Sequence, residues 1–408
     1  MIPVIGKRPD NALPLNKLLN DNKIKEKNVQ AIEIEEEESS TSVYQKLMKK
    51  KATTVKEDQE EIRMENFFET SINNYNEFNE RAYKKGNGYK IPGYPMIEKH
   101  LEGVESGMYL FSGESNSGKS AAMMNIMKDM CSCEENNLFG IYYSLDDSKH
   151  EIIPRIIAME QSIPIGVASK PKRYQDLIDL AMEQEVSNDN TELYRQYLEK
   201  REIGLNKLKS ESHKFLIEDA DKIKTSSDIK NHIKMVKTFL KTYYTERGEV
   251  EKANKMNVII AIDALNDIKL DPKVYGRIRK EDASEEIAKF VKDLSVEFDI
   301  VVFASTHLRK LNGNRRPTLD DLREANTLVY EASVVWLVYN DVSKNKMGAS
   351  IYWNNNGEHG PILEMDWAKN KKSSYKGRTF NKFSPNLSQI RECSQSEMEA
   401  FEQQINQS

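Results

Sequence analysis

Short apolar runs alternate with longer amphipathic stretches from about residue 93 to residue 390. The apolar runs have the length of strands that are buried on both faces of a parallel sheet, and the amphipathic stretches repeat with the period of a helix. This alternation predicts an α/β domain, in which a mostly parallel central sheet is flanked by helices and ligands bind at the carboxyl ends of the strands. The expected strands are 109–111, 139–144, 215–217, 258–262, 300–304 and 334–338, with a possible antiparallel edge at 350–353 and 362–367, and the expected helices are 120–130, 150–161, 226–245 and 284–298.

The segments outside this alternation are polar and charged. Residues 1–53 contain an acidic run and predict a poorly ordered leader, which either binds a partner or is a solvated tail. Residues 54–85 carry an irregular helical stripe of apolar side chains, and glycines and prolines then mark a break. The polar stretch at about 169–211 predicts a helical surface insertion. We therefore expect a leader at 1–53, a linker helix region at 54–85, a main domain at 86–390 and a C-terminal tail at 391–408.

Composition narrows the class of protein. The chain of 408 residues is 38% hydrophobic and 31% charged, with a net charge of −5, so a uniformly basic coat for nucleic acid is excluded but a local basic surface is not. Its three cysteines form neither a disulfide framework nor a zinc spacing, which favours a reducing, cytoplasmic compartment. The sequence contains no apolar stretch long enough to span a membrane, so we expect a soluble protein.

A glycine-rich segment, GESNSGKS at 113–120, directly follows the first apolar run. It matches the phosphate-loop pattern G-x-x-x-x-G-K-[ST] in its required setting, between a strand and a helix. The two glycines allow the backbone N–H groups to converge, the lysine supplies a cation for the outer phosphates, and the last serine supplies a ligand for Mg²⁺. The segment predicts binding of a nucleoside triphosphate, interpreted as ATP, with Mg²⁺, rather than an ordinary Gly/Ser turn. The residues expected to hold the nucleotide are Gly113, Ser115, Asn116, Ser117, Gly118, Lys119, Ser120 and Ala121.

Three polar residues follow other apolar runs and are candidates for the chemistry. Asp263 ends the run VIIAID and is expected to support the metal together with Ser120, although a lone Asp in this position is also a common turn residue. Asp146 follows the run IYYS and can orient the attacking water, while its neighbours Asp147 or Ser148 cap the next helix. His307 follows the run IVVFAST and either senses the loss of the terminal phosphate or is a structural histidine.

Two basic stretches contrast with the acidic average. The first, 309–316, surrounds a glycine turn directly after His307, where its cations can contact a nucleic-acid backbone. The second, 369–378, can reach into the nucleotide site of a neighbouring subunit, although such a charge run is usually a solvated face. The cations concerned are Arg309, Lys310, Arg315 and Arg316 in the first stretch, and Lys369, Lys371, Lys372, Lys376 and Arg378 in the second.

The ordered set of motifs resembles the motor domain of DnaB-type replicative helicases, which have the RecA-like P-loop NTPase fold. The resemblance runs from about residue 93 to residue 385 and is strongest in RRPTLDDLREANTLVYEASVVWLVYND. The other segments that carry it are GESNSGKS, IYYSLDDS, FLIEDADKIKTSSDIKNHI, IIAIDALNDI, ASTHLRK and WAKNKKSSYKG.

The resemblance implies an ATP-driven DNA helicase, a hexameric ring that moves along single-stranded DNA and hydrolyses ATP between subunits. It places Asp146 at the catalytic carboxylate, Asp263 at the metal and His307 at the sensor. It also implies that Arg323, Glu324 and Asn326 contact the single strand, that Lys369 and Lys371 reach the γ-phosphate of a neighbouring subunit, and that the stretch before Lys84 is the linker helix that docks on that subunit. A primase or a loader is a possible further partner.

The sequence departs from the family pattern at three functional positions. Asp146 stands in place of Glu, His307 in place of Gln, and Lys371 in place of an Arg finger, for which Arg378 is an alternative. Lysine is a point charge and lacks the bidentate fork of arginine. A divergent phage-type version without the family's N-terminal collar fits these features. A recombinase filament on the same fold, or an ATP-gated loader or regulator with weak turnover, are the alternatives.

Overall fold

The structure is a computed structural model, and it describes Glu69, Ile72, Asn73, Asn76 and residues 88–407 except 185–188, 213, 277, 312, 314 and 356. The chain divides into two units, Met1–Asn87 and Gly88–Ser408. The expected leader at 1–53 lies outside the described residues, as does the linker helix region at 54–85 apart from those first four residues, each of which is helical.

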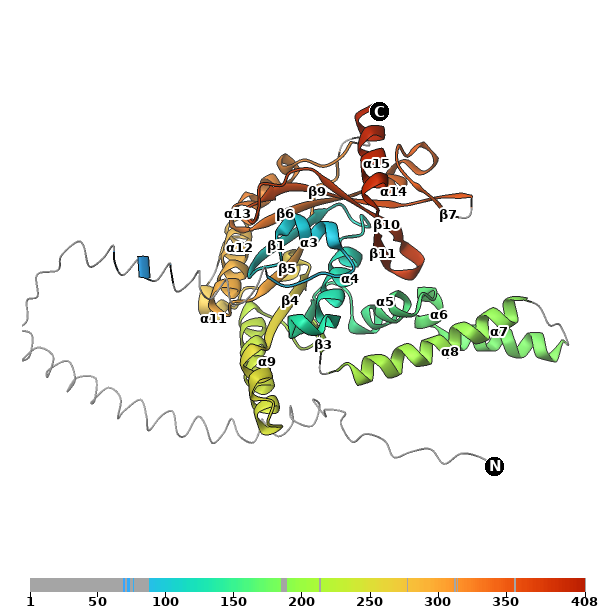
Figure 1. Ribbon diagram of the computed structural model, residues 1–408, viewed down its shortest axis with the longest axis horizontal. Helices are drawn as coiled ribbons and strands as arrows, with labels where there is room; N and C mark the ends of the chain where they lie inside the picture. The colour runs from blue at the N-terminus through green and yellow to red at the C-terminus, as the bar shows by residue number, and fades with distance from the viewer. Residues whose placement is uncertain are drawn as a thin grey trace, which may run out of the picture. The chain divides into compact units, whose positions relative to one another are not determined.

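A nine-stranded sheet forms the centre of this unit, in the order β11-β10-β9-β6-β1-β5-β4-β2-β3 (Figure 1). The strands from β6 to β3 in this order are parallel, and β9, β10 and β11 continue the sheet as antiparallel neighbours. This confirms the predicted mostly parallel sheet. The strands are β1 (Gly107–Gly113), β2 (Leu138–Ser144), β3 (Phe215–Asp219), β4 (Asn257–Asp263), β5 (Val301–His307), β6 (Val334–Asn340), β9 (Ile362–Asn370), β10 (Arg378–Ser384) and β11 (Gln389–Glu392).

Helices cover both faces of the sheet, which is why its central strands are apolar throughout. Successive side chains of a strand point to opposite faces, so Tyr109 and Phe111 belong to one hydrophobic core while Met108 and Leu110 belong to the other. Helices α3 (Pro95–Leu101), α4 (Lys119–Ser132) and α5 (Lys149–Gln161) pack into the first core. Helices α9 (Ser226–Glu246) and α12 (Lys280–Glu297) pack into the second.

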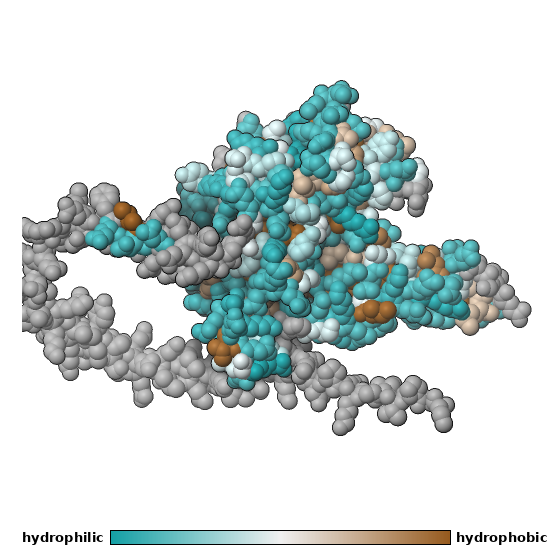
Figure 2. Space-filling model, in the orientation of Figure 1, coloured by the Kyte–Doolittle hydropathy of each residue, from teal (hydrophilic) through white to brown (hydrophobic). Residues whose placement is uncertain are grey.

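The polar stretch expected as an insertion forms α7 (Pro171–Glu183) and α8 (Asp189–Ser210), which extend beside each other away from the sheet (Figure 1). Figure 2 shows a mostly hydrophilic surface with isolated apolar patches on this pair. Leu177, Leu180 and Ile203 are exposed apolar residues of the two helices. The ammonium group of Lys128, which is buried on α4, joins the pair to the domain through Glu160 of α5 and Glu211. None of the described helices is both long enough and apolar enough to cross a bilayer.

The C-terminal part corrects one expected strand and forms folded elements up to residue 407. The run expected as a strand at 350–353 does not join the sheet, because β7 (Trp353–Asn355) pairs with β8 (Glu358–Gly360) in a separate ribbon. The segment expected as a tail at 391–408 is folded: it completes β11 and forms α15 (Gln395–Gln407), whose Met398 and Phe401 pack on Phe380 of β10.

The remaining elements connect these layers. They are α6 (Ile165–Ser169), α10 (Val250–Lys255), α11 (Pro272–Tyr275), α13 (Asn326–Glu331) and α14 (Asp341–Asn345), with short 3-10 helices η1 (Glu134–Asn136), η2 (Leu265–Asp267), η3 (Leu319–Ala325), η4 (Lys346–Gly348) and η5 (Pro385–Leu387).

Candidate nucleotide-binding site

The glycine-rich loop joins β1 to α4 at the carboxyl edge of the sheet. Gly118 has a φ of 101° directly before the helix, and no side chain caps the N-terminus of α4. A Cβ atom on Gly113 would lie 2.5 Å from the Ser117 hydroxyl and 2.6 Å from the Val338 carbonyl oxygen, so only glycine fits there. The first turn of α4 therefore presents N–H groups and the positive end of the helix dipole to an anion.

Lys119 is buried in this loop, with 5% of its surface exposed. Its ammonium group donates to the carbonyl oxygens of Gly113, at 3.0 Å, and Glu114, at 2.7 Å. Burial lowers the pKa of Lys119 to about 8, against the opposing charges of Asp263 and Glu114. A buried ammonium group bonded to carbonyl oxygens is well suited to pair with a phosphate, because a full negative charge would compensate for its lost hydration.

The Ser117 hydroxyl is a second feature that fits a phosphate. Its Oγ atom is buried and has no hydrogen-bond partner among the described residues. Buried polar atoms are nearly always hydrogen-bonded in native proteins. An oxygen of a phosphate bound by the loop would accept the hydrogen bond of this hydroxyl.

Asp263 is fixed at the end of β4 by two hydroxyl groups. Tyr142 donates to one carboxylate oxygen at 2.6 Å and Ser305 donates to the other. Burial and the charge of Asp263 raise the pKa of Tyr142 well above its usual value, so the phenol remains a neutral donor. Both partners lie on neighbouring strands, β2 and β5, so the sheet itself orients this carboxylate.

A second group of charged side chains lies beside Asp263. Burial raises the pKa of Asp267, the charges of Asp146 and Asp263 raise it further, and His307 opposes them. The four side chains therefore share one neighbourhood at the carboxyl edge of the sheet. Asp147 belongs to a different contact, because it pairs with Arg155 of α5 at 2.7 Å.

His307 ends β5 opposite Gly113 of β1, so the expected sensor lies next to the phosphate loop. Asn266 holds this end of the strand: its side-chain oxygen accepts from the Thr306 hydroxyl at 3.1 Å and from the His307 N–H at 3.3 Å. Neither Asn266 nor Asp267 was expected from the sequence to belong to the site. The available signal was their place in the run IDALND, directly after the metal-site candidate.

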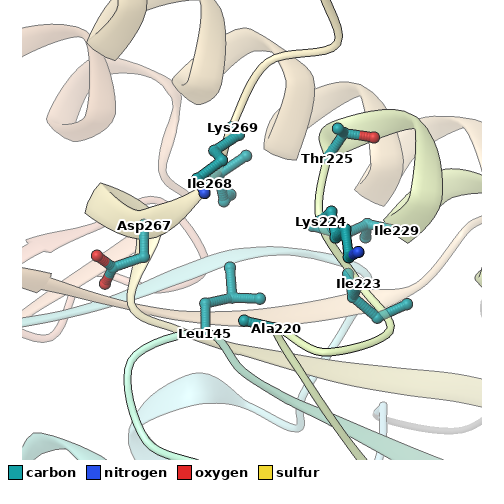
Figure 3. A pocket seen from close by; sticks show the side chains of 9 residues that line it. All are labelled: Leu145, Ala220, Ile223, Lys224, Thr225, Ile229, Asp267, Ile268 and Lys269. Carbon is teal, nitrogen blue, oxygen red and sulfur yellow. The ribbon is translucent and has the colours of Figure 1, made fainter.

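A cavity of about 500 Å³ lies at the same edge of the sheet, beyond β4 and β2 (Figure 3). Its wall is mixed, with aliphatic side chains beside the polar Lys224, Thr225, Asp267 and Lys269. The Asp267 carboxylate points away from Ile223 and Ile229 (Figure 3). The lining residues are Leu145, Ala220, Ile223, Lys224, Thr225, Ile229, Asp267, Ile268 and Lys269.

The cations of the basic stretch 309–316 differ in their exposure and in their ion pairs. Arg309 and Lys310 have exposed side chains. Arg315 pairs with Asp321, and Arg316 forms a bidentate pair with the buried Glu364 of β9. The expected role of Arg316 in DNA contact conflicts with this pair, because its guanidinium is occupied inside the domain.

The expected finger lysines lie far from the phosphate loop of their own chain. Lys369 lies opposite Val335, near the start of β6. The phosphate loop follows the end of β1, which runs parallel to β6. Lys369 and the phosphate loop therefore lie at opposite edges of the sheet, so Lys369 cannot serve the nucleotide bound by its own chain.

The finger candidates also have partners within the chain. Lys369 and Lys371 donate to the Tyr330 carbonyl oxygen of α13, at 2.8 and 3.1 Å, and burial with the charge of Lys371 lowers the pKa of Lys369 to about 8. Arg378 pairs with Glu402 of α15 at 2.8 Å. The side chains of Arg323, Glu324 and Asn326 lie outside what the structure describes.

The fold and the loop together define a P-loop protein of the RecA-like α/β class, with its phosphate loop at the carboxyl edge of the sheet. Residues 91–376 match the DnaB-like helicase C terminal domain family, and the chain belongs to that family. The resemblance stated from the sequence motifs is thereby confirmed.

Two solved structures show the same fold. One, described as an ATPase domain, has 19% identity and a TM-score of 0.57, over 80% of this chain and 98% of its own. A structure of a DnaB-like replicative helicase, described with its interactions with primase, has 18% identity and a TM-score of 0.59, over 94% of this chain and 80% of its own. No curated protein matches the chain.

Proposed function

We propose that this protein is an ATP-dependent replicative DNA helicase, which assembles as a hexameric ring, moves along single-stranded DNA and unwinds duplex by hydrolysing ATP at subunit interfaces. Membership of the DnaB-like family supports the helicase role. The observation that carries the proposal is the separation of Lys119 and Lys369 at opposite edges of one sheet. A site that needs both cations requires two subunits.

The residues of the carboxyl edge fit a triphosphate with Mg²⁺. The N–H groups of the loop and Lys119 would hold the phosphates, while Ser120 and Asp263 would hold the metal, which neutralises charge on the transferred phosphoryl group. Tyr142 and Ser305 donate to the two oxygens of the Asp263 carboxylate and so hold it in one orientation. Asp146 would orient the attacking water, and His307 would report the state of the site to the following basic loop.

The neighbouring subunit would supply the second cation. Lys371 or Lys369 would leave the Tyr330 carbonyl oxygen of α13 and approach the γ-phosphate, with Arg378 as the alternative. Such a residue stabilises the charge of the transition state and can raise turnover by about 10³-fold or more. Turnover would therefore depend on assembly.

Single-stranded DNA would be held through its phosphates and without sequence readout. Arg309, Lys310 and Arg315 have exposed side chains. Arg323 and Glu324 follow in η3, and Asn326 begins α13. We leave Arg316 out because of its pair with Glu364. Binding through phosphates should weaken steeply with salt. A replicative helicase of this kind would work in the cytoplasm, that of the host if it is phage-encoded, and a primase is the partner to test first.

The decisive experiment compares the wild-type chain with Lys119→Ala. We expect DNA-stimulated ATP hydrolysis and strand displacement in the wild type, and neither in the variant, whose fold is checked by circular dichroism. Unchanged hydrolysis by Lys119→Ala would refute the assignment of the site. Strand exchange without displacement would indicate the recombinase, and ATP binding with negligible DNA-stimulated turnover would indicate the loader or regulator.

A further inference from the structure

Glu114, the second residue of the phosphate loop, has a contact that the loop pattern does not require. Its carboxylate accepts the backbone N–H of Leu311 at 3.0 Å and pairs with the ammonium group of Lys344 on α14. Leu311 lies in the basic stretch 309–316, 197 residues further along the chain. The carboxylate is mostly buried, and although burial opposes ionisation, Lys344 and the Leu311 N–H outweigh it and lower the pKa of Glu114.

The backbone of Glu114 is engaged on the other side. Its carbonyl oxygen accepts from Lys119, the cation expected to bind the outer phosphates. One residue thus contacts the phosphate-binding lysine through its backbone and the basic stretch through its side chain. A further bond, from the Leu308 N–H to the Gly113 carbonyl oxygen at 3.1 Å, joins the same two segments.

The three segments around Glu114 are closely packed. The phosphate loop, the start of the basic stretch and the β6–α14 connection enclose a void of only about 20 Å³. Tightly packed segments transmit a displacement because they cannot absorb it. A shift of the phosphate loop on binding a ligand is therefore passed to residues 308–311.

We propose that Glu114 is a positioning residue that couples the nucleotide state of the phosphate loop to the strength of DNA contact by the basic stretch 309–316. A triphosphate brings several negative charges beside the Glu114 carboxylate and withdraws Lys119 from the Glu114 carbonyl oxygen. Both changes weaken the hydrogen bond from the Leu311 N–H to the Glu114 carboxylate. The basic stretch is then released toward the single strand, and it is drawn back when the nucleotide leaves.

The charges around Glu114 determine which substitutions are informative. Lys344 of α14, Lys310 of the basic stretch and Lys119 of the loop all face it, and no other described carboxylate takes part in the contact. Glu114→Gln keeps an acceptor for the Leu311 N–H but removes the charge that a triphosphate repels. Lys344→Gln removes the partner charge and leaves Glu114 in place.

The inference rests on the proposed function, so its test measures how a nucleotide changes the affinity for DNA and does not measure helicase activity. The affinity of the full chain for a fluorescent oligothymidine is measured by anisotropy, without nucleotide and with a slowly hydrolysed ATP analogue. In the wild type we expect the analogue to tighten binding by about 5-fold or more, the usual lower range for coupled sites. In Glu114→Gln the analogue should still bind, but the two DNA affinities should agree within about 2-fold. Glu358→Gln, an exposed acid on β8, is the matched control and should keep the wild-type ratio.

A second measurement needs no DNA. Trypsin cleavage after Arg309 and Lys310 should accelerate in the wild type when the analogue binds and should be independent of the analogue in Glu114→Gln. A wild-type coupling ratio that persists in a folded, analogue-binding Glu114→Gln overturns the inference and leaves the helicase proposal intact. A wild-type chain that binds no DNA overturns the helicase proposal, while the cleavage experiment still decides whether Glu114 links the two loops.

Discussion

The guanidinium of Arg316 and the carboxylate of Glu364 are joined by two hydrogen bonds, of 2.7 and 2.9 Å. Glu364 lies on β9 and is 1% exposed, and Arg316 also lies 3.9 Å from Asp341. A stretch with four cations in eight residues therefore contains one member that holds the domain together. Arg309 and Lys310, at the start of the same stretch, have exposed side chains instead.

Substitution of Arg316 should affect stability more than DNA binding. Arg316→Ala would leave the Glu364 carboxylate buried without its partner, and we expect the free energy of unfolding to fall by about 3–5 kcal/mol. Burial already raises the pKa of Glu364, so the unpaired carboxyl should take up a proton, and the loss should be smaller at lower pH. Denaturant unfolding at two pH values measures both effects.

Arg309→Ala is the matched control for that experiment. Its side chain is exposed, and its removal should change the free energy of unfolding by no more than about 0.5 kcal/mol. It should instead reduce the slope of log affinity for single-stranded DNA against log salt by about 1. Equal stability of the two variants would show that the Arg316–Glu364 pair has no structural role.

The pKa of Lys119 predicts a pH dependence of nucleotide affinity. Burial lowers this pKa to about 8, while Asp263 on β4 and Glu114 in the loop oppose the shift. A phosphate favours the charged form, so the pKa should rise on binding, and affinity should be full below pH 8 and decline above it by up to about tenfold per pH unit. Titration with a fluorescent ATP analogue between about pH 7 and pH 9 tests this.

Lys119→Arg provides the comparison, because a guanidinium stays charged throughout that range. We expect weaker binding by this variant, with an affinity that does not change with pH. A wild-type affinity that is equally flat would show that Lys119 does not titrate in the empty site.

The position of the finger lysines predicts complementation between two inactive variants. Lys119→Ala retains its finger but lacks the phosphate cation, and Lys371→Ala retains the phosphate loop but lacks the finger. In a head-to-tail ring mixed at equal amounts, about a quarter of the interfaces combine the intact loop of one subunit with the intact finger of the next. ATP hydrolysis by the mixture should therefore exceed the sum of the separate variants.

The same mixing experiment identifies the finger. Lys369→Ala and Arg378→Ala replace Lys371→Ala in turn, and only a true finger variant should be inactive alone and rescued in the mixture. Co-assembly is confirmed by size-exclusion chromatography with light scattering. Mixed rings without any gain in hydrolysis would place the entire active site within one chain.

Asn266 should act on turnover rather than on nucleotide binding. It accepts from the Thr306 hydroxyl and from the His307 N–H, and its loss would let the end of β5 move relative to Asp263. We expect Asn266→Ala to lower kcat by about tenfold with little change in KM, the pattern of an interaction that matters in the transition state. Thr306→Val removes one of the two bonds and should have a smaller effect. A raised KM with unchanged kcat would assign Asn266 to ground-state binding.

The sequence predicted those parts of the structure that are determined by residues close together in the chain. Strands β1, β2 and β6 are buried along their whole length and β4 and β5 everywhere but at their ends, so each is visible as an apolar run. The phosphate loop has its glycines and lysine in one short segment. Strands β10 and β11 were missed because β10 alternates with polar residues, two of which, Thr379 and Asn381, are fully buried between antiparallel neighbours. The partners of Glu114 and Arg316 were missed for a different reason. Leu311 and Glu364 are distant from Glu114 and Arg316 in the sequence, and only the order of the strands in the sheet brings each pair into contact.

Helix α15 lies in the segment that the sequence predicted as a C-terminal tail. Phe401 lies 5.7 Å from the ring of Phe380, measured between centroids, and both belong to a small core with Cys393 and Met398. Phe401→Ala should lower the free energy of unfolding by about 3 kcal/mol, the usual cost of truncating a buried aromatic side chain. Gln404→Ala, on the exposed side of the same helix, should change it by less than about 0.5 kcal/mol. If the two variants unfold at the same denaturant concentration, α15 does not contribute to the domain; if only Phe401→Ala unfolds early, residues 395–407 are part of its core.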